Sequence, residues 1–181
     1  MDSGTKNVTP PMKKVLEFGA GKTPAIRDDA EVIHLDVLKL PHIEVVHNLE
    51  KFPYPFKDNT FDEILAFHVL EHISDTVKVM EEIHRISKNG AIVTIEVPYY
   101  NSPSSFRDPT HKSYFSEGTM DYFTDNGVYN YYTKVRFEIK SKKYITSFIG
   151  RLLPEALLIK LAHYVGNIIT IIRFTLIVKK D

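Results

Sequence analysis

Short apolar segments recur along this chain, each followed by a turn or a helical signal, and this rhythm limits the folds that it can adopt. Strands are predicted at residues 13–18, 31–35, 43–46, 61–67, 91–97, 134–144 and 171–179. Strands that are nearly all apolar and alternate with loops or helices indicate a mostly parallel sheet covered on both faces. We expect the last two strands to pair antiparallel at the edge of this sheet.

Helical signals are sparse in the first half of the chain. Residues 24–29 offer about one helical turn, and residues 37–42 are too few for an ordinary crossover helix. Later segments carry apolar residues at helical spacing, and Asn89-Gly90 is a stop signal for the first of them. Helices are therefore predicted at 74–87, 116–123 and 154–165.

The length of 181 residues favours one domain. Within a single domain over 1–181 we expect a flexible tail at 1–12, a substrate-side loop and helix at 99–133, and an apolar helical insertion at 150–170. No apolar run reaches membrane-spanning length, and the N-terminus lacks the apolar core of a signal peptide. The sequence therefore predicts no transmembrane segment and a cytoplasmic location.

Composition narrows the classes of function. Lys+Arg and Asp+Glu both number 23, so the formal net charge is zero, which argues against nucleic acid as a partner. The chain has no cysteine. Disulfides, thiolate nucleophiles and Cys-ligated zinc are therefore excluded.

Three features follow successive predicted strands, where open α/β sheets bind ligands. The first is Glu17-Phe18-Gly19-Ala20-Gly21, whose glycines allow a ligand to approach the backbone closely. The second is Asp36, placed to accept hydrogen bonds from ribose hydroxyls. The third is Asn48-Leu49, which would flank an adenine ring. Together they predict a nucleoside site, whereas the glycines alone fit a ligand-free turn equally well.

The residues around the glycines indicate which kind of nucleotide the site would bind. A Walker A loop needs glycine where Leu16 stands, and a dinucleotide fingerprint needs a third glycine or alanine where Pro24 stands. Glu17 would repel a pyrophosphate but would attract an ammonium group. S-adenosylmethionine carries an ammonium and a sulfonium and has no phosphate, so the charges favour it over NAD or ATP.

Four blocks of sequence resemble the type 11 family of class I methyltransferases: VLEFGAG, HLDV, NLEKFPYPFKDNTFDEILAFHVLEHISD and EEIHRISKNGAIVTIEVP. The resemblance covers about residues 15–98. It implies a Rossmann-like α/β fold with a seven-stranded, mostly parallel sheet whose last strand is antiparallel. It also implies S-adenosylmethionine as the cofactor and methyl transfer as the activity.

The resemblance assigns residues to parts of the cofactor. Glu17, Gly19 and Gly21, with Ala20 between the glycines, would hold the methionine part. Asp36 would bind the ribose, Asn48 and Leu49 would border the adenine, and Phe67 and His68 would line the pocket near the sulfonium. Asn48 departs from the pattern, because the family usually has Asp there, although an amide also bonds an adenine edge.

Catalytic residues are harder to predict, because the cofactor activates the methyl group and the protein mainly aligns the reactants. His111, in the loop after the fifth strand, is the first candidate for a general base, with a loop-stabilising histidine as the alternative. His68 is the second. His68 and His72 flank Glu71, and this group either binds a metal or acts as a base, or else His68 lines the pocket and His72 caps a helix. The second interpretation is favoured, so we expect no metal.

A small-molecule acceptor is the leading expectation. A methyltransferase acting on protein or RNA is a first alternative, and a non-catalytic cofactor-binding subunit of another methyltransferase is a second. The apolar helical segment near the C-terminus either packs on the terminal strands or docks on a partner subunit, as in a homodimer, or on a membrane surface.

Overall fold

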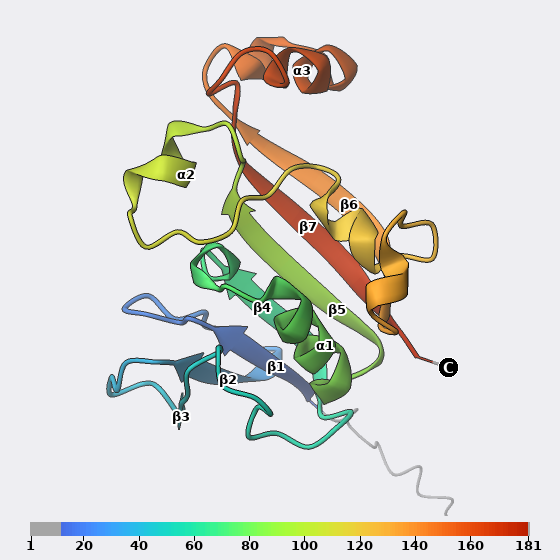
Figure 1. The fold of residues 1–181 in the computed structure, drawn as a ribbon. Helices are drawn as coiled ribbons and strands as arrows, with labels where there is room; N and C mark the ends of the chain where they lie inside the picture. Colours follow the sequence, from blue (N-terminus) through green and yellow to red (C-terminus); the bar gives the residue numbers. More distant parts are fainter. Residues whose placement is uncertain (1–11, 181) are drawn as a thin grey trace, which may run out of the picture.

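A computed structural model, which describes residues 12–180, contains one seven-stranded sheet in the order β3-β2-β1-β4-β5-β7-β6 (Figure 1). The strands are β1 (Lys13–Phe18), β2 (Ala30–Asp36), β3 (Val45–Val46), β4 (Phe61–Phe67), β5 (Ser87–Pro98), β6 (Arg136–Thr146) and β7 (Ile169–Lys179). β7 runs antiparallel to both β5 and β6, and the other pairs are parallel. The expected sheet, with its antiparallel last strand, is confirmed.

The helices are few and short. They are α1 (Thr76–Ile86), α2 (Pro103–Arg107) and α3 (Glu155–Ala162), with 3-10 turns η1 (Leu70–His72), η2 (Thr119–Phe123), η3 (Asn130–Tyr132) and η4 (Gly150–Leu152). Within residues 12–180 no helix precedes η1, so the segment 24–29 forms no helical turn. The loop expected at 101–114 contains α2, and the helix expected at 116–123 is only the 3-10 turn η2.

Helix α1 begins at a side-chain cap and ends where the next strand begins to pair. The Asp75 carboxylate caps it by accepting a hydrogen bond of 3.0 Å from the Lys78 N–H. The helix ends at Ile86 rather than at the expected stop, Asn89-Gly90, because Ser87 already pairs with Phe61 as the first residue of β5. Gly90, with φ of +80°, lies within a register shift of that strand.

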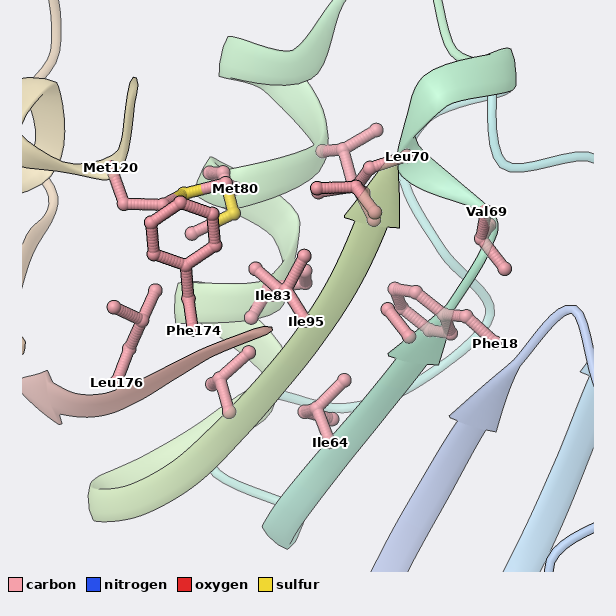
Figure 2. Close-up of a cluster of buried hydrophobic side chains, with 14 of the residues drawn as sticks. Phe18, Ile64, Val69, Leu70, Met80, Ile83, Ile95, Met120, Phe174 and Leu176 are labelled. Atoms are coloured by element: carbon pink, nitrogen blue, oxygen red, sulfur yellow. The ribbon is translucent and has the colours of Figure 1, made fainter. Parts of the chain in front are cut away.

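The main core lies between α1 and one face of the sheet (Figure 2). Met80 and Ile83 of α1 are fully buried there against side chains of the central strands. Burying an aliphatic side chain of this size stabilises a fold by about 1.5–3 kcal/mol. These contacts fix the central strands, whose carboxyl ends carry the predicted site. The strand residues in this core include Phe18, Ile64, Ile95, Phe174 and Leu176.

The expectation that helices cover both faces is wrong for the described part of the chain. Figure 1 shows α1 on one face of the sheet, and no helix of residues 12–180 packs on the other. The connections after β1 and β2 are too short to form crossover helices. That face instead carries ion pairs such as Arg27–Glu63, at 2.7 Å.

Three remaining expectations concern the ends and the inserted segment. The tail expected at 1–12 lies outside the described residues, except for Met12. The segment 150–170, between β6 and β7, holds η4 and α3. Leu158 and Ala162 are buried, whereas Tyr164 is 89% exposed, so this segment packs on the domain through one side only. No helix among residues 12–180 has the length and apolar character needed to cross a membrane.

Candidate functional site

A cavity of about 370 Å³ opens at the carboxyl ends of β1, β2 and β4. This is the edge at which open α/β sheets bind ligands, and the volume falls in the range of small-molecule sites, roughly 300–1,000 Å³. The lining residues are Gly19, Leu35, Asp36, Val37, His47, Asn48, Leu49, Glu50, His68, Val69, His72 and Ile73.

The turn after β1 requires glycine at Gly19. Its φ is +62°, and a Cβ built on it would lie 2.4 Å from Cγ2 of Val69. Its N–H donates a hydrogen bond of 2.8 Å to the Leu35 carbonyl, which fixes the turn beside β2. The bare backbone at Gly19 therefore forms one wall of the cavity.

Asp36 ends β2 and is 8% exposed. Its Oδ2 accepts a hydrogen bond of 2.9 Å from the Gly21 N–H, and its Oδ1 accepts one of 2.8 Å from the Leu38 N–H. A carboxylate offers about four acceptor positions, so lone pairs remain for the hydroxyls of a ligand. Both backbone donors hold the carboxylate in place at the cavity.

Asn48 and Leu49 form the third wall. The Asn48 side chain accepts a hydrogen bond of 2.9 Å from the Glu50 N–H, which shapes the turn. The buried Tyr54 hydroxyl donates to the Leu49 carbonyl at 3.0 Å. The side chain of Leu49 thus stands on a braced loop and presents an apolar surface to the cavity.

Four of the residues predicted to bind the cofactor do not line the cavity: Glu17, Ala20, Gly21 and Phe67. The Glu17 carboxylate accepts a hydrogen bond of 2.8 Å from the Ala25 N–H and lies 3.7 Å from Nε2 of His34. The ring of Phe67 instead lies 5.7 Å from the guanidinium of Arg173. Their contact with the methionine part or the sulfonium stays a prediction.

His68 lies between two carboxylates. Its Nδ1 is 3.3 Å from Oε1 of Glu71, and its Nε2 is 3.3 Å from Oε1 of Glu96. Its backbone φ of +55° is unusual for a residue with a side chain. The Glu71 carboxylate, more than any other neighbour, raises the pKa of His68. A histidine that keeps its proton to higher pH is a weaker candidate for a general base near neutrality.

His72 and His111 meet at the rim of the cavity. His72 lines it, and His111 does not, but the two ring centres lie 4.8 Å apart. The interpretation of His72 as a helix cap is wrong, because Asp75 caps α1. No residue of the loop 101–114 lines the cavity, and this loop contacts η1 through its Lys112 and Ser113 N–H groups.

Several lining residues were not predicted from the sequence. Most directly follow or precede a predicted one, as Val37 follows Asp36, Glu50 follows Leu49 and Val69 follows His68. Their position next to the end of a strand is the signal that would have found them. Glu96 gave no such signal, because it lies inside β5 and reaches His68 from a neighbouring strand.

Residues 11–95 match the family described as a methyltransferase domain. An uncharacterised protein of Methanocaldococcus jannaschii is 36% identical over 87 residues, which cover 44% of this chain and 37% of that protein. Demethylmenaquinone methyltransferase of Lysinibacillus sphaericus is 33% identical over 66 residues, covering 33% of this chain and 28% of that protein. The match thus spans about a third of the length of these relatives.

Among solved structures, a SAM-dependent methyltransferase from Archaeoglobus fulgidus superposes with a TM-score of 0.57 at 17% identity, covering 92% of this chain and 86% of that chain. At this identity the likeness concerns the fold. The family match over residues 11–95 and the strand order together support a class I S-adenosylmethionine-dependent methyltransferase domain, and the solved structure shares its fold.

Proposed function

We propose that this chain transfers a methyl group from S-adenosylmethionine to a small-molecule acceptor. The observation that carries the proposal is the cavity at the strand ends, where Gly19, Asp36 and Leu49 meet. A bare backbone, a held carboxylate and an apolar wall match the parts of a nucleoside that has no phosphate. Gly19 must stay without a side chain, because a Cβ there would collide with Val69.

When it is bound, S-adenosylmethionine supplies a methyl group that its sulfonium activates for in-line displacement. The protein's part is to bind, orient and exclude water. Asp36 would accept the ribose hydroxyls, and Leu49 would pack on the adenine beside Asn48. Glu17 would attract the ammonium of the methionine part. His68, held between Glu71 and Glu96, would form the wall near the sulfonium.

Two observations support a small-molecule acceptor. The net charge is zero, which does not favour an extended polyanion such as RNA. The relative from Lysinibacillus sphaericus is a demethylmenaquinone methyltransferase, an enzyme named for a small acceptor. An acceptor atom that carries a proton also needs a proton acceptor, for which His111 is the residue predicted from the sequence.

Calorimetry tests the cofactor. S-adenosylmethionine and S-adenosylhomocysteine are titrated into the protein, with NAD and ATP as controls. We expect micromolar binding of the first pair alone, and its loss in an Asp36→Ala variant whose circular dichroism matches that of the wild type. Tight binding of NAD or ATP, or unchanged binding in the variant, would overturn the proposal.

A contact between two copies through the segment 150–170 is part of the proposal. Four large apolar side chains of this segment are exposed, Leu152, Leu157, Tyr164 and Val165. Exposed apolar side chains that gather in one region are typical of interaction surfaces. Size-exclusion chromatography of wild type and Leu152→Glu tests the contact. We expect a dimer that the variant converts to a monomer, and a monomeric wild type would contradict this.

A further inference from the structure

Two histidines and a glutamate converge beside the cavity. One ligand atom each of Glu71, His72 and His111 lies within 4.8 Å of the others. Glu71 and His72 belong to η1, and His111 belongs to the loop after α2, so the chain brings them together from separate elements. We propose that these three side chains bind one divalent transition metal ion, with Zn²⁺ as the leading candidate.

The His111 ring is oriented as a ligand. Its Nδ1 lies 2.9 Å from the Ser105 carbonyl oxygen, which accepts hydrogen bonds and donates none. In the neutral ring the hydrogen therefore sits on Nδ1, and the lone pair sits on Nε2. Histidines that bind metals commonly donate the opposite ring N–H to a backbone carbonyl in this way.

The His72 ring is fixed by a chain of two hydrogen bonds. The Thr110 hydroxyl donates to the Asp108 carboxylate at 2.6 Å, so its hydrogen is already used. The Thr110 oxygen lies 2.9 Å from Nδ1 of His72 and is left to accept from it. The lone pair of the neutral His72 ring therefore also lies on Nε2, with a carboxylate supporting the ring through a hydroxyl.

Glu71 supplies the negative charge and an atom without a partner. The residue is 2% exposed. Its Oε1 faces His68 at 3.3 Å, whereas its Oε2 is buried and has no hydrogen-bond partner in the described part of the chain. A buried carboxylate oxygen with no donor is costly, because it has lost its water and gained nothing in return. A cation placed among Glu71, His72 and His111 would remove that cost.

The backbone holds this arrangement without a metal. The Glu71 carbonyl accepts hydrogen bonds from the N–H groups of Lys112, at 2.7 Å, and Ser113, at 3.0 Å. The Ser113 hydroxyl donates to the Ile73 carbonyl at 2.7 Å. The loop that carries His111 is thus tied to η1, so little ordering is needed when an ion binds.

The ligand set selects the kind of metal. Two imidazoles and one carboxylate suit zinc or ferrous iron, and hard ions such as Mg²⁺ prefer oxygen ligands. Three protein ligands leave at least one coordination position for water or another oxygen ligand. His72 also lines the cavity, so the ion would stand at its rim.

Two other histidines with carboxylate neighbours lack this arrangement. His34 uses Nδ1 toward Glu44, at 3.0 Å, and Nε2 toward the Ala25 carbonyl, at 3.1 Å, so neither nitrogen is left for an ion. His163 faces the single carboxylate of Glu117 at 3.1 Å. A metal on Nε2 of His111 would occupy the lone pair that a general base needs, so this site replaces the catalytic role predicted for His111.

The test uses the full chain without an affinity tag, stripped of metal with a chelator. Calorimetry with Zn²⁺ and visible absorption with Co²⁺ measure affinity and stoichiometry. We expect one ion per chain and its loss in His72→Asn and His111→Asn. Thr110→Val, which removes the hydroxyl that links His72 to Asp108 but no metal ligand, should weaken binding about 10–100-fold.

His163→Asn is the matched control, because it removes a histidine that also faces a carboxylate but lies outside the cluster. It should bind the ion as the wild type does. Circular dichroism of each variant shows whether it is folded. The proposal is overturned by a wild type that binds no stoichiometric ion. It is equally overturned by binding that survives in folded His72→Asn and His111→Asn.

Discussion

The Asp36 carboxylate accepts a hydrogen bond of 2.9 Å from the Gly21 N–H, which ties the end of β2 to the glycine turn after β1. One side chain thus shapes the turn and also presents its remaining lone pairs to the cavity. Asp36→Asn keeps the size of this side chain but replaces an acceptor oxygen with a donor. We expect affinity for S-adenosylmethionine to fall by about 1.5–3 kcal/mol, the worth of a hydrogen bond to a charged group, as measured by calorimetry.

Glu31→Gln provides the control for this change. Glu31 lies on the same strand, and its side chain is 55% exposed, so neutralising it alters the charge of β2 without touching the cavity. Its affinity should equal that of the wild type. Equal affinity in Asp36→Asn as well would show that Asp36 makes no contact with the ribose.

Gly19→Ala should destabilise the fold for two separable reasons. Its φ of +62° costs a residue with a Cβ roughly 1–2 kcal/mol, and the new Cβ would lie 2.4 Å from Cγ2 of Val69. Gly90→Ala, with φ of +80° and no heavy atom within 4 Å of the new Cβ, carries the first cost alone. Chemical denaturation should therefore show a larger loss of unfolding free energy for Gly19→Ala than for Gly90→Ala.

The collision can be tested by a double-mutant cycle with Val69→Ala. Shortening Val69 removes the collision but leaves the backbone strain, so the second substitution should cost less in the Gly19→Ala background than in the wild type. Strictly additive losses would mean that the chain avoids the collision by moving the turn.

The strands could be predicted because each is a continuous apolar run bounded by polar or turn residues. β1 and β4 begin and end as the sequence indicated, since nothing outside the strands is needed to recognise them. The end of α1 could not be predicted in the same way. Ser87 leaves the helix to pair with Phe61, a contact between residues far apart in sequence that outweighs the local stop signal at Asn89-Gly90.

The candidate site likewise contains residues that the sequence could predict and contacts that it could not. Gly19, Asp36 and Leu49 could be predicted, because each follows a strand whose end the sequence marks. The neighbours of His68 and His111 could not. Glu96 comes from inside another strand, and the Ser105 carbonyl comes from a loop whose path depends on its own packing. Such contacts arise from tertiary structure, and single-sequence patterns do not encode them.

Arg85 braces the loop that carries the Asn48 and Leu49 wall. Its guanidinium donates to the Glu82 carboxylate at 2.7 Å and to the Tyr54 and Phe56 carbonyls at 3.1 and 2.8 Å. Arg85→Ala removes these bonds together and leaves the Glu82 carboxylate without its cation. We expect a loss of about 1–3 kcal/mol of unfolding free energy.

The same variant should weaken nucleoside binding, although Arg85 does not line the cavity, because Tyr54 supports Leu49 through its hydroxyl. Calorimetry on Arg85→Ala, below its unfolding temperature, measures this indirect effect. Lys140→Ala, at an exposed residue of the edge strand β6, is the control and should change neither quantity. A destabilised Arg85→Ala that binds as tightly as the wild type would show that the wall holds its shape without this brace.

His68 should make stability depend on pH. The Glu71 carboxylate, together with Glu96, raises the pKa of His68 in the folded state above its ordinary value of 6.5. A raised pKa means that the folded state binds the proton more tightly, so this stabilisation is complete below pH 6.5 and is lost as pH rises through the folded-state pKa. The effect should be modest, because the side chain is 46% exposed and solvent screens the pairs.

Two measurements check this dependence. NMR titration of the His68 ring should give a pKa above 6.5. Arg173 holds the Glu96 carboxylate in place at 2.7 Å, beside Nε2 of His68. Glu96→Gln removes this negative charge, so the pKa of His68 should be lower in that variant. The melting temperature of the wild type should decline more steeply above pH 6.5 than that of His68→Gln, which lacks the titrating group. A ring that titrates at or below its ordinary pKa, and does so equally in Glu96→Gln, would mean that the two carboxylates do not hold a charged imidazole between them.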